Sequence, residues 1–194
     1  MKDVFIISDN IVSPLGCTTG ENFVQLTNGV TGIVQHPASS NISPRPFYAS
    51  LIKKEQEKKW FADTGKTGQY TKFEKLLMLS ISSALQNATI DISAAETVLI
   101  ISSTKGNIGL LETENMSGEL KDRISLHASA KLIANHFQNK NLPVVISNAC
   151  ISGLTALLTG KRLIESGQYK HAVVAGADLI SAFVLSGFTY SHAI

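Results

Sequence analysis

Short runs of apolar residues alternate with longer amphipathic segments along this chain. The short runs are rich in Val, Ile and Ala and show no alternation between apolar and polar positions. This pattern is typical of strands that are covered on both faces, as in a parallel sheet. We predict four such strands, at residues 4–8, 97–102, 144–147 and 172–175.

The longer segments have the period of α-helices, with apolar positions three or four residues apart. A capping box at residues 18–21 predicts the start of the first helix. Strands that alternate with helices predict an α/β fold with a mostly parallel, mixed sheet and helices on both faces. This pattern alone does not separate a thiolase-like fold from a Rossmann-like one. Two later helices show clear apolar faces, one with Phe73, Leu76, Leu77, Ile81, Ala84 and Leu85, the other with Leu126, Ala130, Ile133, Ala134 and Phe137.

Residues 34–70 interrupt this regular alternation. Pro37, Pro44 and Pro46 break regular structure, and the charged segment KKEQEKK follows at residues 53–59. We interpret the stretch as an irregular surface excursion of one domain, because the next helix must return to the core. A chain of 194 residues is long enough for one domain with a sizeable core.

Composition narrows the functional classes. The net charge is +2 and only 16% of the residues are charged, so nothing indicates a nucleic-acid partner. Asp9 interrupts the first apolar run, which argues against a signal peptide, and no run approaches the roughly 20 residues that span a bilayer. The two cysteines, Cys17 and Cys150, do not make a disulfide framework, which indicates a reducing compartment. We therefore expect a cytoplasmic protein.

The histidines give no sign of a metal site or of a catalytic pair. No two of them have the spacing of metal ligands, so we expect no metal. A cysteine enzyme needs a partner base or acid, but the surroundings predicted for each histidine argue against that role. The five are His36, His127, His136, His171 and His192.

Residues 143–167, PVVISNACISGLTALLTGKRLIESG, are the most informative part of the chain. A short apolar strand ends at Ser147, small residues form a tight turn, and a helix is predicted from Ile151 to Ser166, with Gly167 as its stop. Cys150 therefore lies on the elbow between a strand and a helix. Backbone N–H groups at a helix start carry positive potential, which favours the thiolate form of a cysteine placed there.

A structural role is the common alternative for such a residue, because free cysteine is among the most buried residue types. A structural role would be preferred for a cysteine whose neighbours indicate no special geometry, and we adopt it for Cys17. At Cys150 the elbow and its small neighbours Ala149, Ser152 and Gly153 favour a nucleophile, since they leave room for an acyl group to approach.

The elbow resembles the nucleophile elbow of the β-ketoacyl-acyl-carrier-protein synthases, the condensing enzymes of fatty-acid and polyketide synthesis. Four further stretches of the chain are similar to the family, and in the last, at residues 169–188, Asp178 stands where the family usually has an acid. The chain departs from the family pattern in Ser147-Asn148 before the cysteine, in Lys105 within the Gly-rich loop, and in its length. The four stretches follow the family's order and are VFIISDNIVSPLG at 4–16, ENFVQLTNGVTGI at 21–33, ISSTKGNIGLLE at 101–112 and YKHAVVAGADLISAFVLSGF at 169–188.

The resemblance implies the N-terminal half of a thiolase-like fold. It implies that Cys150 accepts an acyl group from acyl-carrier protein as a thioester, and that this group is condensed with a decarboxylated malonyl unit. It also implies a homodimer, in which the strand before the nucleophile pairs with its two-fold mate, and no cofactor. The substrate-binding residues that it implies are Lys105, Gly106, Ser152, Gly153 and Phe188.

The resemblance further implies a basic patch for docking the acidic carrier protein. The candidate lysines are Lys53, Lys54, Lys58 and Lys59, with Lys72 and Lys75 as rivals. The alternative is a solvated surface helix, because Glu55 and Glu57 dilute the charge of this segment.

The family folds as two similar halves, and 194 residues correspond to about one of them. The resemblance places the catalytic histidines in the second half, so we expect an N-terminal fragment or truncated product that cannot condense by itself. A non-catalytic partner subunit of the chain-length-factor type, or a remnant reading frame, is an alternative, although such subunits usually lack the cysteine. A thiolase fragment that acts on acyl-coenzyme A is a further alternative, but the Ser-Pro-Leu-Gly loop at 13–16 fits the synthase better.

Overall fold

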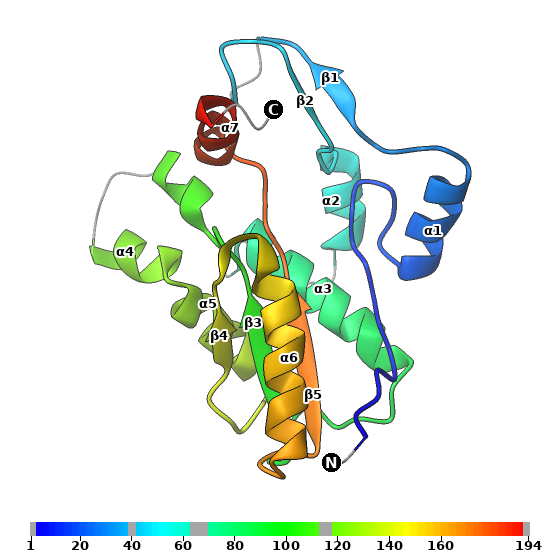
Figure 1. Cartoon of the computed structure of the whole chain (residues 1–194). Helices are drawn as coiled ribbons and strands as arrows, with labels where there is room; N and C mark the ends of the chain where they lie inside the picture. The colour runs from blue at the N-terminus through cyan, green and yellow to red at the C-terminus, as the bar shows by residue number, and fades with distance from the viewer. Residues whose placement is uncertain (1–2, 39–41, 63–69, 113–117, 192–194) are drawn as a thin grey trace.

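A three-stranded parallel sheet forms the centre of the molecule (Figure 1). The computed structural model describes residues 3–38, 42–62, 70–112 and 118–191. The strands are β3 (Thr97–Ser102), β4 (Val144–Ile146) and β5 (His171–Gly176), in the order β4-β3-β5. The last residue of β3 lies opposite the last residue of each neighbour. All three strands therefore end at the same edge of the sheet.

Helices cover both faces of this sheet, as the sequence predicts (Figure 1). Helix α6 (Ser152–Glu165) covers one face, and α3 (Lys72–Gln86) and α5 (Leu126–His136) cover the other. The central strand β3 is fully buried, with alternate side chains facing each layer. The core is therefore built around a strand whose neighbours lie far away in sequence.

The predicted boundaries agree closely with these elements. Strand β3 matches the prediction, β4 ends one residue earlier, and β5 extends one residue further at each end. The predicted apolar face of α3 is mostly buried, since Phe73, Leu76, Leu77 and Ile81 are each at most 6% exposed. Helix α1 (Thr19–Thr27) begins after Thr18, whose side chain accepts a hydrogen bond from the Glu21 N–H.

The prediction of a strand at residues 4–8 is wrong. This segment forms no ladder in the part of the chain that the structure describes. Side chains hold it against α3 instead, as where the Ser8 hydroxyl donates to the Ala84 carbonyl at 2.7 Å. An apolar run becomes a strand only where a neighbour supplies ladder hydrogen bonds, and Phe5 and Ile6 remain 76% and 79% exposed.

The stretch at 34–70 is more regular than expected. It contains a small antiparallel sheet, made of β1 (Val34–His36) and β2 (Phe47–Ala49), and the helix α2 (Lys54–Trp60). The remaining elements are two 3₁₀ turns, η1 (Ile108–Glu112) and η2 (Ala149–Ile151), and the helices α4 (Gly118–Ile124) and α7 (Ala182–Tyr190). None of the helices within the described ranges combines the length and the apolar character that crossing a membrane requires.

Candidate active site

Cys150 lies at the shared carboxyl edge of the sheet, on the predicted elbow. It is the middle residue of η2, between the end of β4 and the start of α6, and it is exposed. The residue before it, Ala149, has a φ of +45°, in the left-handed region that costs a residue with a Cβ roughly 1–3 kcal/mol. The surrounding structure must therefore hold this turn in place.

Ser152 closes the elbow. Its hydroxyl accepts a hydrogen bond from the Asn148 N–H at 2.8 Å and donates one to the Ala149 carbonyl, also at 2.8 Å. The side chain is buried, and its hydroxyl is occupied on both sides by backbone groups of the turn. In the structure Ser152 therefore supports the shape of the elbow, and its predicted contact with substrate stays a prediction.

The Gly-rich loop after β3 lies beside the elbow. The Thr104 hydroxyl donates to the Ala149 carbonyl at 3.0 Å, so this carbonyl has two hydroxyl donors. Gly106 in the loop is buried and has a φ of +51°. An added Cβ there would overlap the end of the Leu126 side chain and would stand on a strained backbone, so glycine is favoured where this loop packs on α5. Lys105, beside it, is half-buried.

Asp178 ties this loop to the chain that follows β5. Its Oδ1 accepts hydrogen bonds from the Ser103 hydroxyl at 2.7 Å, from the Thr104 N–H at 3.1 Å and from the Lys105 N–H at 3.0 Å. Three strand ends thus converge, with the elbow from β4, the Gly-rich loop from β3 and Asp178 from the segment after β5. The sequence resemblance had marked Asp178 as an acid at a family position, but not these contacts.

A buried polar cluster lies next to this loop and was missed in the sequence. We call it the Glu74 cluster; it consists of Thr71, Glu74, Asn107, Arg123 and Ser129. The Glu74 carboxylate has no exposed surface and pairs with the Arg123 guanidinium at 2.8 Å. Burial alone raises the pKa of Glu74, but hydrogen bonds from Arg123, Thr71 and Ser129, with the charge of Arg123, lower it on balance. Glu74 is therefore held as a carboxylate.

Helix α6 leaves one apolar face uncovered next to Cys150. Ile151, Leu154, Leu157 and Leu158 are between 43% and 68% exposed. The three leucines border a hollow of about 1280 Å³ that also contacts the N-terminal segment and β5. Large apolar side chains that lie exposed side by side are typical of a surface that another chain or segment contacts.

Two of the predicted substrate residues lie on helices at the surface. Gly153 is exposed in the first turn of α6, three positions after Cys150. Phe188 is 46% exposed on α7, the helix that packs beside η1. The contacts of both with substrate stay predictions.

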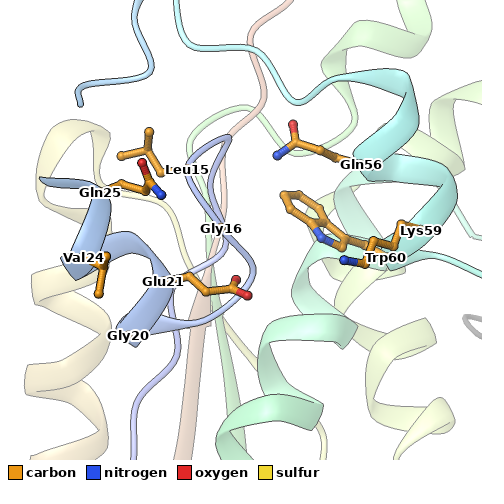
Figure 2. Close-up of a pocket in the computed structure, with 9 residues that line it drawn as sticks. All are labelled: Leu15, Gly16, Gly20, Glu21, Val24, Gln25, Gln56, Lys59 and Trp60. Carbon is orange, nitrogen blue, oxygen red and sulfur yellow. The ribbon is translucent and has the colours of Figure 1, made fainter. Parts of the chain in front are cut away.

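The four candidate docking lysines lie on and just before α2, and all are exposed. Glu57 pairs with Lys72, which reduces the negative charge on this face. Lys59 and Trp60 form one wall of a hollow of about 460 Å³ (Figure 2), and Glu21 on α1 lies on the opposite side. The segment is thus a surface helix with excess positive charge, and its docking role stays a prediction.

Cys17 has different surroundings from Cys150. It is half-buried, and its N–H donates to the Glu21 carboxylate at 2.7 Å. Burial raises the pKa of the Cys17 thiol, and a hydrogen bond from the thiol to Glu21, with the negative charge of Glu21, raises it further. Among the described residues, no group of three or more His, Cys, Asp or Glu side chains is placed to hold a metal. His192 lies outside the described residues, and His171 begins β5, at the edge of the sheet opposite Cys150.

Comparisons with known proteins point to this same elbow. Residues 146–185, which include Cys150 and Asp178, match the model of the family described as 3-Oxoacyl-[acyl-carrier-protein (ACP)] synthase III. A curated relative, the beta-ketoacyl-[acyl-carrier-protein] synthase III of Oceanobacillus iheyensis, is 32% identical in an alignment 84 residues long, which covers 38% of this chain and 27% of that protein.

Solved structures agree in fold over nearly the whole chain. A beta-ketoacyl synthase from Burkholderia phymatum STM815 has a TM-score of 0.73 at 19% identity, over 100% of this chain and 51% of that one. The ishigamide ketosynthase/chain length factor has a TM-score of 0.72 at 17% identity, over 97% of this chain and 55% of that one. A type II polyketide synthase acyl-carrier protein in complex with its ketosynthase, bound to the hexaketide, has a TM-score of 0.71 at 16% identity. The match covers 97% of this chain and 48% of that one.

These comparisons confirm the sequence resemblance to the β-ketoacyl synthases and the thiolase-like fold. The chain spans about half the length of the solved structures that it matches.

Proposed function

We propose that this chain is the N-terminal half of a β-ketoacyl-acyl-carrier-protein synthase and that Cys150 is its acyl-accepting nucleophile. The observation that supports this most directly is the exposed thiol on a strand–turn–helix elbow, at the edge where three strand ends converge. The family match over residues 146–185 includes this elbow.

The proposed step is transfer of an acyl group between two thiols. The Cys150 thiolate attacks the carbonyl carbon of an acyl thioester, a carbon–sulfur bond forms, and the carbonyl electron pair moves to oxygen. The C=O bond then re-forms as the bond to the donor sulfur breaks, and the donor thiol leaves after taking a proton from water. The N–H of Cys150 is our candidate donor to the transient oxyanion.

In the whole enzyme the acyl group would then be condensed with a decarboxylated malonyl unit. This second step needs groups that stabilise an enolate, and the resemblance assigns them to histidines of the second half. We propose that the second half covers the exposed apolar face of α6, and that the free edge of β4 pairs with a second copy of the chain. Sedimentation of the purified chain should then show a species larger than a monomer at micromolar concentration.

The nucleophile is tested by measuring acyl transfer to the isolated chain. We expect octanoyl-acyl-carrier protein to add one octanoyl group, located on Cys150 by peptide mass spectrometry. Cys150→Ala should abolish the addition, and Cys17→Ala, the matched control, should retain it. Addition to Cys17, or the same addition in Cys150→Ala, would refute the proposed nucleophile.

The class of acyl donor, carrier protein or coenzyme A, is tested by reversing the charge of lysines on α2. We propose that the α2 lysines attract an acidic acyl-carrier protein. Reversing Lys58 and Lys59 to Glu should slow acylation by the carrier-bound donor at low salt but not acylation by octanoyl-coenzyme A. Lys170→Glu is the control, since Lys170 is exposed beside β5, at the opposite edge of the sheet. A wild-type chain that accepts acyl groups from coenzyme A alone would favour the thiolase alternative.

A further inference from the structure

The peptide between Ala149 and Cys150 is held by several donors to its carbonyl. This oxygen accepts hydrogen bonds from the Thr104 hydroxyl at 3.0 Å, from the Ser152 hydroxyl at 2.8 Å and from the Ser152 N–H. Because a peptide unit is planar and trans, fixing the direction of its C=O fixes the opposite direction of its N–H. That N–H belongs to Cys150.

The backbone conformation beside this peptide is itself unfavourable. Ala149 has a φ of +45°, which a residue with a Cβ adopts at a cost of roughly 1–3 kcal/mol. When the Thr104 hydroxyl is removed, only Ser152 still donates to this carbonyl, and the peptide can rotate about ψ of Ala149 and φ of Cys150. The Cys150 N–H would then turn away from its present direction.

Thr104 in turn depends on Asp178. One carboxylate oxygen, Oδ1, accepts hydrogen bonds from the Thr104 N–H, from the Lys105 N–H and from the Ser103 hydroxyl, at 2.7–3.1 Å. A charged acceptor makes stronger hydrogen bonds than a neutral one, so it suits an oxygen that holds three donors. Asp178 therefore fixes the loop from which the Thr104 hydroxyl reaches the elbow.

We propose that Asp178 is a positioning residue that acts through Thr104 and the Ala149 carbonyl to orient the Cys150 N–H toward the oxyanion formed during acyl transfer. This inference rests on the proposed function, because it assigns the N–H a role in the same reaction. Its consequence is specific. We call the contacts from Asp178 to Thr104 and from Thr104 to the Ala149 carbonyl the clamp. Loss of the clamp should slow a reaction that forms an oxyanion, and should leave the rate of a simple substitution at the same sulfur unchanged.

Two reagents separate these effects at Cys150. Octanoyl-N-acetylcysteamine acylates the thiol through an oxyanion, whereas iodoacetamide forms a bond from sulfur to carbon as iodide leaves, with no oxyanion. We expect Thr104→Val to slow acylation at least about tenfold, since an oxyanion donor is worth about 10²–10³-fold. Alkylation should stay within about twofold of wild type, because it depends on the thiolate and its exposure.

Matched variants test the route from Asp178. Thr104→Ser keeps the hydroxyl and should acylate at close to the wild-type rate, and Thr159→Val, a similar change on α6 away from the elbow, should have no effect. Asp178→Asn should slow acylation selectively. If both residues act through one contact, the Asp178→Asn/Thr104→Val double variant should be no slower than the slower single variant.

The outcomes distinguish the two proposals. Wild-type acylation with unchanged rates in Thr104→Val and Asp178→Asn would overturn the clamp but leave the nucleophile intact. Equal losses in the rates of acylation and alkylation in these variants would also overturn the clamp, since the two residues would then only maintain the fold. A wild-type chain that iodoacetamide modifies at Cys150 but that no thioester acylates would overturn the proposed function, and the clamp with it.

Discussion

Replacing Glu74 with Ala should destabilise the protein by about 3–5 kcal/mol. The carboxylate has no exposed surface, and Arg123 donates to it at 2.8 Å, Ser129 at 2.8 Å, the Thr71 N–H at 2.9 Å and Asn107 at 3.2 Å. Breaking a buried pair by removing one partner costs about this amount. Here the buried Ser129 and Asn107 lose an acceptor, whereas the Arg123 side chain is 30% exposed and can be solvated. Several of these donors retain a second partner, so their individual losses should not be added.

Urea unfolding followed by circular dichroism measures this loss. With a urea slope of about 1–3 kcal/mol per molar, the midpoint should fall by roughly 1–5 M. Glu74→Gln keeps the shape of the side chain and should lose less, which gives a folded variant if Glu74→Ala does not fold. The matched control is Glu96→Ala, which removes an exposed pair with Lys170 at 3.2 Å and should cost at most about 1 kcal/mol.

The reasoning would be refuted if Glu74→Ala unfolded within about 1 kcal/mol of wild type. A double-mutant cycle with Arg123→Met gives a second check. If the two side chains act as a pair, removing both should cost clearly less than the sum of the single losses. Additive losses would mean that the ion pair is not the source of the stability.

Three further outcomes follow from the same structure. Folding lowers the pKa of Glu74, so its contribution to stability is complete above its pKa in the unfolded chain, about 4.3, and is lost as pH falls through its pKa in the folded protein. The wild-type urea midpoint should therefore drop more steeply below about pH 5 than the midpoint of Glu74→Gln. Gly106→Ala should lower the melting temperature because of its φ of +51° and its overlap with α5, whereas Gly20→Ala, in an open position on α1, should raise it slightly; equal shifts would contradict the packing argument. Iodoacetamide at pH 7 should label Cys150 before Cys17, and labelling of Cys17 should accelerate at a higher pH than that of an ordinary thiol. Early labelling of Cys17 in folded protein would refute the elbow interpretation.

The sequence predicted those elements whose pattern is local. Apolar runs without alternation identified β3, β4 and β5, and the spacing of small residues around Cys150 identified the elbow. The same rule failed at residues 4–8, because an apolar run does not reveal whether a neighbouring strand is present to pair with it.

The contacts of the site could not be predicted in the same way. Asp178 and Thr104 are 74 residues apart, and only the end-to-end alignment of the parallel strands brings them together. Glu74 lies on a helical face that is otherwise apolar, where its position gives no sign that Arg123 and Asn107 will meet it in the interior. Polar residues that meet through tertiary structure leave no periodic signal.

The order of the strands also determines when this protein can fold during its synthesis. Strand β3 is the most buried element, yet both of its neighbours are translated after it, and Thr97 meets His171 only 74 residues later. At about 5–20 residues per second, the ribosome needs roughly 4–15 s to make that interval. Until β4 is made, the side chains of Val98, Leu99, Ile100 and Ile101 have no partner strand, and the sheet stays incomplete until β5 follows. A nascent chain in this state is a natural client for chaperones that bind exposed apolar segments, and slow translation between residues 103 and 170 would lengthen its exposure.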